Sequence, residues 1–313
     1  MIVPYINPDT DGIVSSIAYA IYKKKVEKIS CKPSYFGILN PETTFVLDNF
    51  RVNSRYSPIK VDRPSTKYNY ILIDTHHKDQ LPAQFPYGNV IEIIDHHLGG
   101  NYELFTKAYI QNEKVGAVAT LIAEKYKIFD LIPPEPVAGI LACGIVSNTL
   151  NFIAPSTSVR DKAAFKWLTK FVKINEGFIQ KMFKKRTEMN YKDTVSLLSS
   201  DLKIFTFDNF RIGVSQLESV EINKLLNRAD IEDALRNIKT KRRLNFIMFN
   251  GVDIAERKSY LYCLEKTMQH VLRNKLNIQF NGKIAVCERV ILRKTDIIPV
   301  LMDYFGRKHF IHK

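Results

Sequence analysis

Aspartate and histidine side chains follow three separate apolar runs, and their types and spacing could hold divalent metal ions. The segments are Asp9-Thr10-Asp11 after residues 2–6, Asp74 after residues 70–73, and Asp95-His96-His97 after residues 90–94. Neighbouring strands of a sheet lie about 5 Å apart, so side chains at their ends can converge on one point. Carboxylates packed this closely repel one another unless cations neutralise them, and carboxylate with imidazole suits Mn²⁺, Co²⁺, Zn²⁺ or Mg²⁺.

Each of these segments taken alone also has a purely structural interpretation. An isolated Asp-Thr-Asp is more often a turn or a helix N-cap, and an isolated Asp-His-His is often a loop or a hydrogen-bonded histidine pair. Because all three segments lie in the first half of the chain and each ends an apolar run, we favour a shared metal site.

The apolar runs need a parallel sheet to bring their ends together. The runs at residues 2–6, 70–73 and 90–94 are typical of buried parallel strands, and helical periodicity appears at residues 15–26, 115–127 and 134–148. This alternation predicts an α/β fold in which ligands bind at the carboxyl ends of the strands.

The pattern changes after about residue 200, where it predicts a smaller α+β unit. We expect strands at residues 202–207, 210–214, 244–249 and 283–289, with helices at residues 220–238 and 261–276. The predicted architecture is therefore an N-terminal parallel sheet flanked by helices, followed by a second, smaller α+β domain.

The chain has 313 residues and a net charge of +14, from 46 Lys and Arg against 32 Asp and Glu. This charge favours acidic partners such as phosphates, polyphosphate or nucleic acid, although a lysine-rich solvated surface explains it equally well. The four cysteines form no Cys-x-x-Cys pair, which argues against a zinc ribbon and suits a reducing compartment. With no secretory signal and no apolar run long enough for a membrane span, we expect a cytoplasmic protein without a membrane partner.

Several motifs, spread in order over nearly the whole chain, resemble those of a known superfamily. They are Asn7-Pro8-Asp9-Thr10-Asp11, Asp74, Asp95-His96-His97, Val115-Gly116-x-x-Ala119-Thr120, Gly144-Ile-Val-Ser-Asn-Thr-Leu-Asn-Phe152 and Arg293-Lys294-x-x-Ile297-Ile298-Pro299. The set resembles the DHH phosphoesterases, and among them the family II inorganic pyrophosphatases and the related exopolyphosphatases and Prune proteins. The resemblance implies a DHH domain over residues 1–174, a linker at 175–181 and a substrate-binding DHHA2 domain over 182–313.

The same resemblance implies roles for individual residues. The implied metal ligands are Asp9, Asp11, Asp74, His96 and Asn148. The implied catalytic and phosphate-binding residues are His97, Asp74, Lys192, Arg293 and Lys294. In this scheme Asp74 bridges two ions of Mn²⁺, or of Mg²⁺ or Co²⁺, in one active site.

Two positions depart from the family pattern. Tyr5 stands where the pyrophosphatases have a histidine, and Asn148 stands where they have a metal-binding aspartate. A neutral phenol and a neutral amide are weaker ligands than the residues they replace, so we expect weaker metal binding. His76 or His77 could supply the missing imidazole, but we favour a loop in which both point to solvent.

Two bound ions would support hydrolysis of a P–O–P bond. We therefore expect a metal-dependent hydrolase of phosphoanhydrides, diverged from inorganic pyrophosphatase and acting on pyrophosphate or short polyphosphate. The alternatives are an exopolyphosphatase and a catalytically impaired anion-binding protein of the same fold. A DHH-type nuclease is disfavoured because the chain lacks the glycine-rich motif of its C-terminal domain. The expected partner is thus a small phosphoanhydride rather than nucleic acid, and a homodimer stays open.

Overall fold

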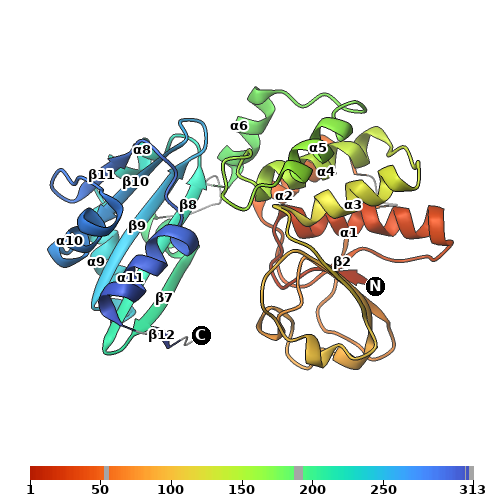
Figure 1. Cartoon of the computed structure of the whole chain (residues 1–313), viewed down its shortest axis with the longest axis horizontal. Coiled ribbons are helices and arrows are strands. Elements are labelled where there is room, and N and C mark those ends of the chain that lie inside the picture. The colour runs from red at the N-terminus through yellow and green to blue at the C-terminus, as the bar shows by residue number, and fades with distance from the viewer. Residues whose placement is uncertain (53–55, 187–192, 307, 310–313) are drawn as a thin grey trace. The chain divides into compact units, whose positions relative to one another are not determined.

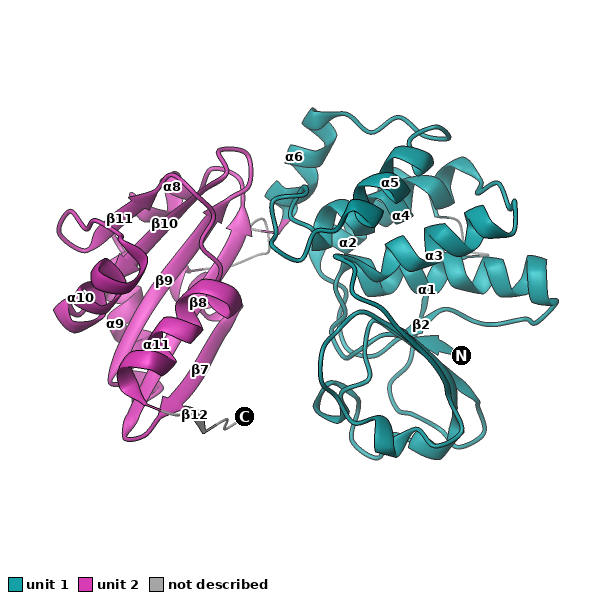
Figure 2. Cartoon of the chain, viewed as in Figure 1, with its two compact units in different colours: residues 1–185 teal, residues 186–313 magenta. Residues whose placement is uncertain are grey.

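The computed structural model describes residues 1–52, 56–186, 193–306 and 308–309. Residues 1–185 and 186–313 form two compact units, each with a sheet and a core of its own (Figure 2). The helices and strands of both units are labelled in Figure 1.

The main sheet of the first unit is parallel and has the strand order β1-β4-β5-β6. Its strands are β1 (Ile2–Val3), β4 (Tyr70–Ile73), β5 (Val90–Asp95) and β6 (Tyr109–Asn112). A separate parallel pair joins β2 (Ser34–Tyr35) to β3 (Ile59–Lys60). Because β1, β4 and β5 are neighbours and run the same way, their carboxyl ends lie along one edge.

Helices lie on one side of this sheet, where α1 and α3 contact its strands and the other helices pack around them. They are α1 (Thr10–Tyr22), α2 (Pro41–Asn49), α3 (Val118–Ile128), α4 (Glu135–Asn148), α5 (Val159–Leu168) and α6 (Glu176–Lys185), with a π-helical turn at Lys23–Glu27 after α1. Helix α1 contacts β1, β4, α3 and α4. A Cβ atom on Gly144 of α4 would lie 2.6 Å from Cγ2 of Val14, so glycine permits the close approach of α4 to α1.

Loops cover the other face of the sheet. Phe36, Phe85 and Phe105 cluster there with Tyr70 and Leu72 of β4. Short 3-10 turns within these loops span Lys78–Gln80, Tyr87–Asn89 and Tyr102–Leu104. Both faces of β4 are therefore buried, which explains its continuous apolar sequence.

The second unit is built on a mixed sheet with the order β11-β10-β9-β8-β7-β12. Its strands are β7 (Leu202–Phe207), β8 (Phe210–Ser219), β9 (Phe246–Asp253), β10 (Lys258–Cys263), β11 (Ile284–Cys287) and β12 (Lys308–His309). Its helices are α7 (Thr194–Ser199), α8 (Ile222–Leu226), α9 (Ile231–Lys241), α10 (Lys266–Leu276) and α11 (Ile298–Phe305), with a π-helical turn at Arg293–Ile297. Successive side chains of β9 lie on opposite faces of the sheet. Ile247 and Phe249 pack with residues of α7, α8 and α9, whereas Met248 packs with residues of α10 and α11.

The predicted α/β fold class is confirmed, but several element boundaries were predicted wrongly. Helix α1 begins at Thr10 rather than at residue 15, because Asp9 caps it. The single helix expected at 220–238 is two helices, α8 and α9. The helix expected from residue 261 begins only at Lys266, because β10 continues to Cys263 with its side chains alternating between the two cores.

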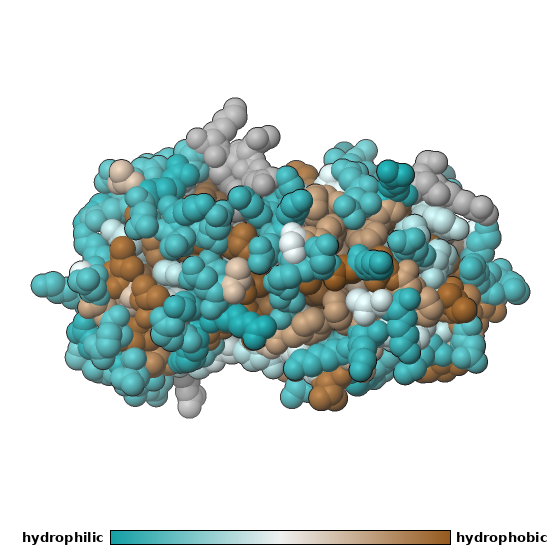
Figure 3. Space-filling model, turned by 90° about the horizontal axis from the view of Figure 1, so that it is seen from above, coloured by the Kyte–Doolittle hydropathy of each residue, from teal (hydrophilic) through white to brown (hydrophobic). Residues whose placement is uncertain are grey.

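Helix α6 occupies most of the segment expected as a linker, and Phe178 on it stacks on Phe45 of α2 with ring centroids 5.4 Å apart. The residue limits expected for the two domains stay predictions. Over the described residues, no helix combines the length and apolar character needed to cross a membrane. The face shown in Figure 3 is largely hydrophilic, with hydrophobic residues exposed between the polar ones.

Candidate metal centre

The carboxylate of Asp74 is buried at the centre of the candidate site. The Asp74 backbone N–H donates to the carbonyl of Ile94 at 2.9 Å, which places Asp74 beside the end of β5. Its φ of +64° is left-handed, which costs a non-glycine residue roughly 1–2 kcal/mol. Both carboxylate oxygens are buried and accept no hydrogen bond from any described residue. Buried oxygens of this kind are costly unless a cation or proton binds them.

Other titratable side chains surround Asp74. Burial, followed by the charges of Asp9 and Asp11, raises the pKa of Asp74 well above its ordinary value. Its Oδ1 lies 3.1 Å from Nε2 of His96 and 3.8 Å from Nδ1 of His97. Candidate ligand atoms that lie within 4.8 Å of one another come from Asp74, Asp95, His96 and His97. This geometry concentrates lone pairs at the ends of β4 and β5.

Asp9 caps helix α1 and also faces the site. Its Oδ1 accepts the N–H of Gly12 at 3.0 Å, so the structural interpretation of Asp-Thr-Asp holds for this residue. The Asp9 N–H donates to the Tyr5 hydroxyl at 3.2 Å. A Cβ atom on Gly12 would lie 2.8 Å from Cβ of Pro4 and 3.3 Å from Oδ2 of Asp74, so glycine lets the helix start approach the carboxylate.

Asp11 is fully buried and joins α1 to α3. Its Oδ2 accepts the N–H of Val118 at 2.7 Å, and its Oδ1 accepts the N–H of Ala119 at 2.9 Å. Burial and the charge of Asp9 raise the pKa of Asp11 to about 7. Each oxygen has two lone pairs, so these bonds leave Asp11 able to bind a cation as well.

His96 presents Nε2 to Asp74. Its Nδ1 lies 2.9 Å from the carbonyl of Val115, which can only accept, so Nδ1 carries a proton and Nε2 faces the carboxylate. Burial opposes protonation of the ring, but the interaction with Asp74 raises the pKa of His96 to about 10. Nε2 is therefore the nitrogen that faces Asp74, and in neutral His96 its lone pair could bind a cation there.

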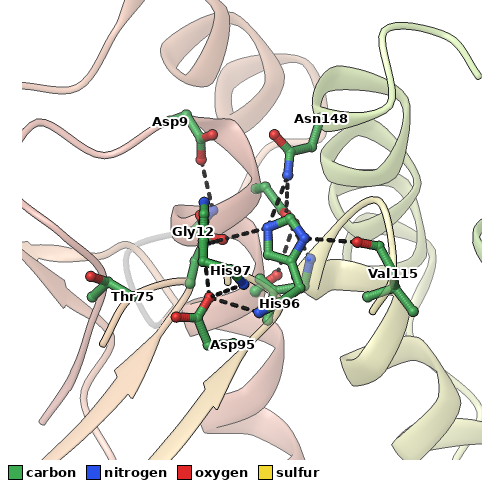
Figure 4. A network of polar contacts seen from close by, with 12 residues as sticks. Asp9, Gly12, Thr75, Asp95, His96, His97, Val115 and Asn148 are labelled. Atoms are coloured by element: carbon green, nitrogen blue, oxygen red, sulfur yellow. Dashed lines mark hydrogen bonds and ion pairs between the residues drawn. The ribbon is translucent and has the colours of Figure 1, made fainter. Parts of the chain in front are cut away.

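Asp95 orients the histidines that follow it. Its Oδ1 accepts the N–H of His96 at 2.7 Å, the N–H of His97 at 3.2 Å and Nδ1–H of His97 at 2.8 Å (Figure 4). Burial opposes ionisation, but the hydrogen bonds with His76 and His97 hold the pKa of Asp95 below its usual range. The bond to Nδ1 leaves Nε2 of His97 available on a side chain that is 31% exposed.

The expectation that His76 points to solvent is wrong. His76 is fully buried, with Nδ1 facing Oδ2 of Asp95, Nε2 facing the carbonyl of Gly99, and its ring stacked on Tyr102 at 4.4 Å. Since a carbonyl accepts only, Nε2 carries a proton and neither nitrogen is left to bind a metal. His76 thus replaces no missing ligand, and the same role for the half-buried His77 stays a prediction.

Asn148 turns its amide nitrogen, rather than its oxygen, toward the site. Nδ2 donates to Oδ2 of Asp11 at 3.1 Å and to the carbonyl of Gly116 at 3.0 Å, and lies 3.3 Å from Nε2 of His96. Both oxygen partners can only accept, so the nitrogen must face them. Figure 4 shows the amide oxygen pointing away from His96.

The donor set fits a divalent ion at Asp74. The fit rests on the two buried oxygens of Asp74 without hydrogen bonds and on the orientation of His96, whose backbone-bonded Nδ1 is the usual arrangement for a ligand that binds through Nε2. Carboxylates with one imidazole suit Mn²⁺, Mg²⁺ or Co²⁺. Asp9 and Asp11 lie close enough to raise the pKa of Asp74, whereas Asn148 offers the site an N–H group.

In the second unit, the guanidinium group of Arg293 is held by hydrogen bonds to Asp201 and Val214. Its Nη1 donates to the carbonyls of Asp201 and Val214 at 2.6 and 3.2 Å, and its Nη2 donates to both carboxylate oxygens of Asp201 at 3.0 and 2.8 Å. Lys294 is exposed and makes no ion pair with a described residue. The predicted Lys192 lies outside the described residues. The phosphate-binding roles of these three residues stay predictions.

One buried carboxylate that holds a loop of the site in place was not predicted from the sequence. Asp161, on α5, accepts the N–H of Gly116 at 2.9 Å and the hydroxyl of Thr120 at 2.6 Å, and so holds the loop that carries the carbonyl bonded by Asn148. Ser158 and Asp161 also form a capping box. The Ser-x-x-Asp spacing at the start of a helix is a readable signal for the cap, although not for its contact with Gly116.

Family models match both parts of the chain. The model described as the DHH family, N-terminal domain, matches residues 1–145, and the model described as the DHHA2 domain matches residues 180–304. The matched segments contain the carboxylates around Asp74 and the segment that begins at Arg293.

Relatives match over almost the full length. Proteins named "Probable manganese-dependent inorganic pyrophosphatase" from Bacillus mycoides and Brevibacillus brevis are each 30% identical, over 96% of this chain and 96% of the relative. The crystal structure of a Methanococcus jannaschii protein assigned to the family II inorganic pyrophosphatases superposes with a TM-score of 0.71. It is 26% identical and covers 97% of this chain and 98% of that chain.

Proposed function

The chain belongs to the family of proteins that join a DHH domain to a DHHA2 domain, and from this premise we propose that it is a metal-dependent hydrolase of phosphoanhydride bonds. The proposed substrate is pyrophosphate. The observation that carries the proposal is the buried carboxylate of Asp74, which has no hydrogen bond and lies among candidate ligands. The names of the full-length relatives support both the substrate and manganese.

The proposed metal ligands are Asp9, Asp11, Asp74 and His96. When bound there, two divalent ions would supply Lewis acidity and lower the pKa of a water molecule. Asp95 orients His97 through Nδ1, so Nε2 of His97 is placed to donate a proton to a phosphate oxygen or to hydrogen-bond it. Fixed donors of this kind stabilise charge that develops during phosphoryl transfer without reorganising.

The second unit would contribute to substrate binding in this proposal. Lys294 is exposed and has no ion pair with a described residue, so its ammonium group can bind a phosphate oxygen directly. Arg293 is already paired with Asp201, and binding a phosphate through its Nη atoms would require exchange of those bonds. The cytoplasmic location and the homodimer expected from the sequence stay predictions.

Three observations favour alternatives within the same fold. The net charge of +14 and Tyr5 at the pyrophosphatase histidine position favour a longer polyanion, as in an exopolyphosphatase. The N–H group that Asn148 turns toward the site favours a catalytically impaired anion-binding protein.

Phosphate release from pyrophosphate, tripolyphosphate, long polyphosphate and a dinucleotide, each with Mn²⁺, Mg²⁺ or Co²⁺, tests the proposal. We expect metal-dependent hydrolysis of pyrophosphate and a loss of at least about 100-fold in Asp74→Asn. Asp79→Asn is the matched control, because Asp79 is an exposed aspartate five residues further along. Faster release from tripolyphosphate or long polyphosphate would favour the exopolyphosphatase. Release from no substrate with any metal would contradict an enzyme and favour the binding protein.

A further inference from the structure

The amide nitrogen of Asn148 lies among three groups that offer lone pairs. They are Oδ2 of Asp11 at 3.1 Å, the carbonyl of Gly116 at 3.0 Å and Nε2 of His96 at 3.3 Å. The two oxygens can accept a hydrogen bond or bind a cation, and Nε2 of His96 can do so when His96 is neutral with its proton on Nδ1. The amide N–H therefore occupies the kind of surroundings in which a metal ion would otherwise lie.

In the two-ion arrangement that the family resemblance implies, Asp9 binds the first ion, Asp11 and His96 bind the second, and Asp74 bridges both. Asn148 lies near the lone pairs of Asp11 and His96, and its side-chain hydrogen bonds among the described residues include none to Asp74 or Asp9. The buried oxygens of Asp74 thus have no hydrogen-bond partner, whereas Asp11 is engaged by an uncharged donor that also lies beside His96. An ion at the second position must therefore displace the hydrogen bond from Asn148 to Asp11, whereas an ion at the first position displaces no bond from Asn148.

We infer that Asn148 makes the two metal positions unequal: the second ion binds more weakly than the first, because the Asn148 amide competes for Asp11 and His96. This inference rests on the metal-binding part of the proposed function and goes beyond it. Asn148 is here a competing hydrogen-bond donor rather than a weak ligand. To present Oδ1 instead, the amide must turn over and give up its bonds to Asp11 and Gly116.

The surroundings of Asn148 favour the orientation observed. The carbonyl of Gly116 belongs to a loop that Asp161 holds through the Gly116 N–H at 2.9 Å. Asp11 is held by two backbone N–H groups of α3. Neither acceptor can turn away when an ion arrives, so a reversed amide would place its oxygen against two other oxygens.

Titration of the full-length chain with Mn²⁺ in the absence of substrate tests this inference. Isothermal calorimetry gives the stoichiometry and both affinities, and electron paramagnetic resonance separates the hyperfine-split signal of isolated Mn²⁺ from the broadened signal of a coupled pair. We expect one ion to bind at least about 10-fold, and up to about 100-fold, more tightly than the second. Two ions of equal affinity in the wild-type chain would overturn the inference.

Two substitutions distinguish a competing donor from a weak ligand. Asn148→Asp removes the N–H group and adds a charged ligand, so both ions should bind with similar affinity and the coupled signal should appear at lower Mn²⁺ concentration. Asn148→Ala removes the amide altogether, so the second ion should bind at least as tightly as in wild type. Weaker binding of the second ion to Asn148→Ala would show that the amide is a ligand and overturn the inference.

Asn274→Asp is the matched control, because it makes the same chemical change at an exposed position of α10 and should leave both affinities unchanged. Since no substrate is present, the outcome is separate from that of the hydrolysis assay. A chain that releases no phosphate but binds two Mn²⁺ ions unequally would support this inference while contradicting the proposed activity. A chain that binds no Mn²⁺ would overturn both.

Discussion

Nδ1 of His76 forms a hydrogen bond with Oδ2 of Asp95, and both side chains are fully buried. His76 follows strand β4, and Asp95 is the last residue of the neighbouring strand β5. The carboxylate of the Asp-His-His segment therefore acts through other residues. It holds His76 on one side and His97 on the other, and both backbone N–H groups that follow it. The Asp-His-His segment thus contains one residue, Asp95, whose contacts are structural.

The pair of His76 and Asp95 should contribute strongly to the stability of the first unit. His76→Ala leaves a buried carboxylate with fewer donors, and breaking a buried pair from one side costs about 3–5 kcal/mol. We expect a loss of this size in the free energy of urea-induced unfolding, followed by circular dichroism.

His77→Ala is the control for the neighbouring position, because His77 is half-buried and does not bond Asp95. It should lower the free energy of unfolding by less than about 1 kcal/mol. Equal losses in the two variants would contradict the structural role assigned to His76.

Gly12 should control how closely α1 approaches Asp74. An alanine there would place a Cβ atom 2.8 Å from Cβ of Pro4 and 3.3 Å from Oδ2 of Asp74, so the carboxylate or the helix start must move. We expect Gly12→Ala to lower Mn²⁺ affinity about 10- to 100-fold, the range typical when the support of a metal ligand is disturbed.

Gly177→Ala is the matched change in α6, where the nearest atom to the new Cβ is Oδ1 of Asn175 at 3.5 Å. In a helix this replacement stabilises by about 0.5–1 kcal/mol, and it should leave Mn²⁺ affinity unchanged. Calorimetric titration of both variants compares them directly. Unchanged affinity in Gly12→Ala would show that the site tolerates the shift.

The sequence predicts the positions of the strand-end aspartates because short-range patterns determine them. The apolar run before Asp74 ends where β4 ends, and Asp95 is the last residue of β5. The orientation of Asn148 could not be predicted, since it depends on the carbonyl of Gly116 and on Asp11, which is 137 residues away. The contact between His76 and Asp95 likewise depends on the pairing of β4 with β5.

Arg293 and its neighbour Lys294 should affect different properties. Arg293→Lys loses the paired bonds to the Asp201 carboxylate and the bonds to two carbonyls, so we expect a loss of about 1.5–3 kcal/mol in the free energy of unfolding. Lys294→Ala removes an exposed side chain and should change stability by less than about 0.5 kcal/mol.

In the hydrolysis assay, Lys294→Ala should raise KM for pyrophosphate if its ammonium group binds the substrate. Urea-induced unfolding and steady-state kinetics of both variants separate the two effects. A Lys294→Ala chain with unchanged KM and kcat would remove Lys294 from the proposed substrate site.

Glu232 should make the stability of the second unit depend on pH in the acid range. Lys283 lies 2.5 Å and Arg236 2.7 Å from its Oε1, and Tyr262 donates to Oε2 at 3.0 Å. These contacts, led by Lys283, lower the pKa of Glu232 to about 2 from an ordinary value of 4.5. A carboxylate with a lowered pKa contributes stability above its ordinary pKa, and this contribution is lost as the pH falls toward 2.

The free energy of unfolding of wild type should therefore exceed that of Glu232→Gln at pH 7 and at pH 5, and the difference should shrink at pH 3. Because Glu232 is partly exposed to solvent, the difference should also shrink in 1 M salt, where the Debye length is about 3 Å. Glu288→Gln is the matched control, since Glu288 pairs with Lys258 from a side chain that is 75% exposed. A difference for Glu232→Gln that grows between pH 5 and pH 3 would reverse the predicted sign and exclude these pairs as its cause.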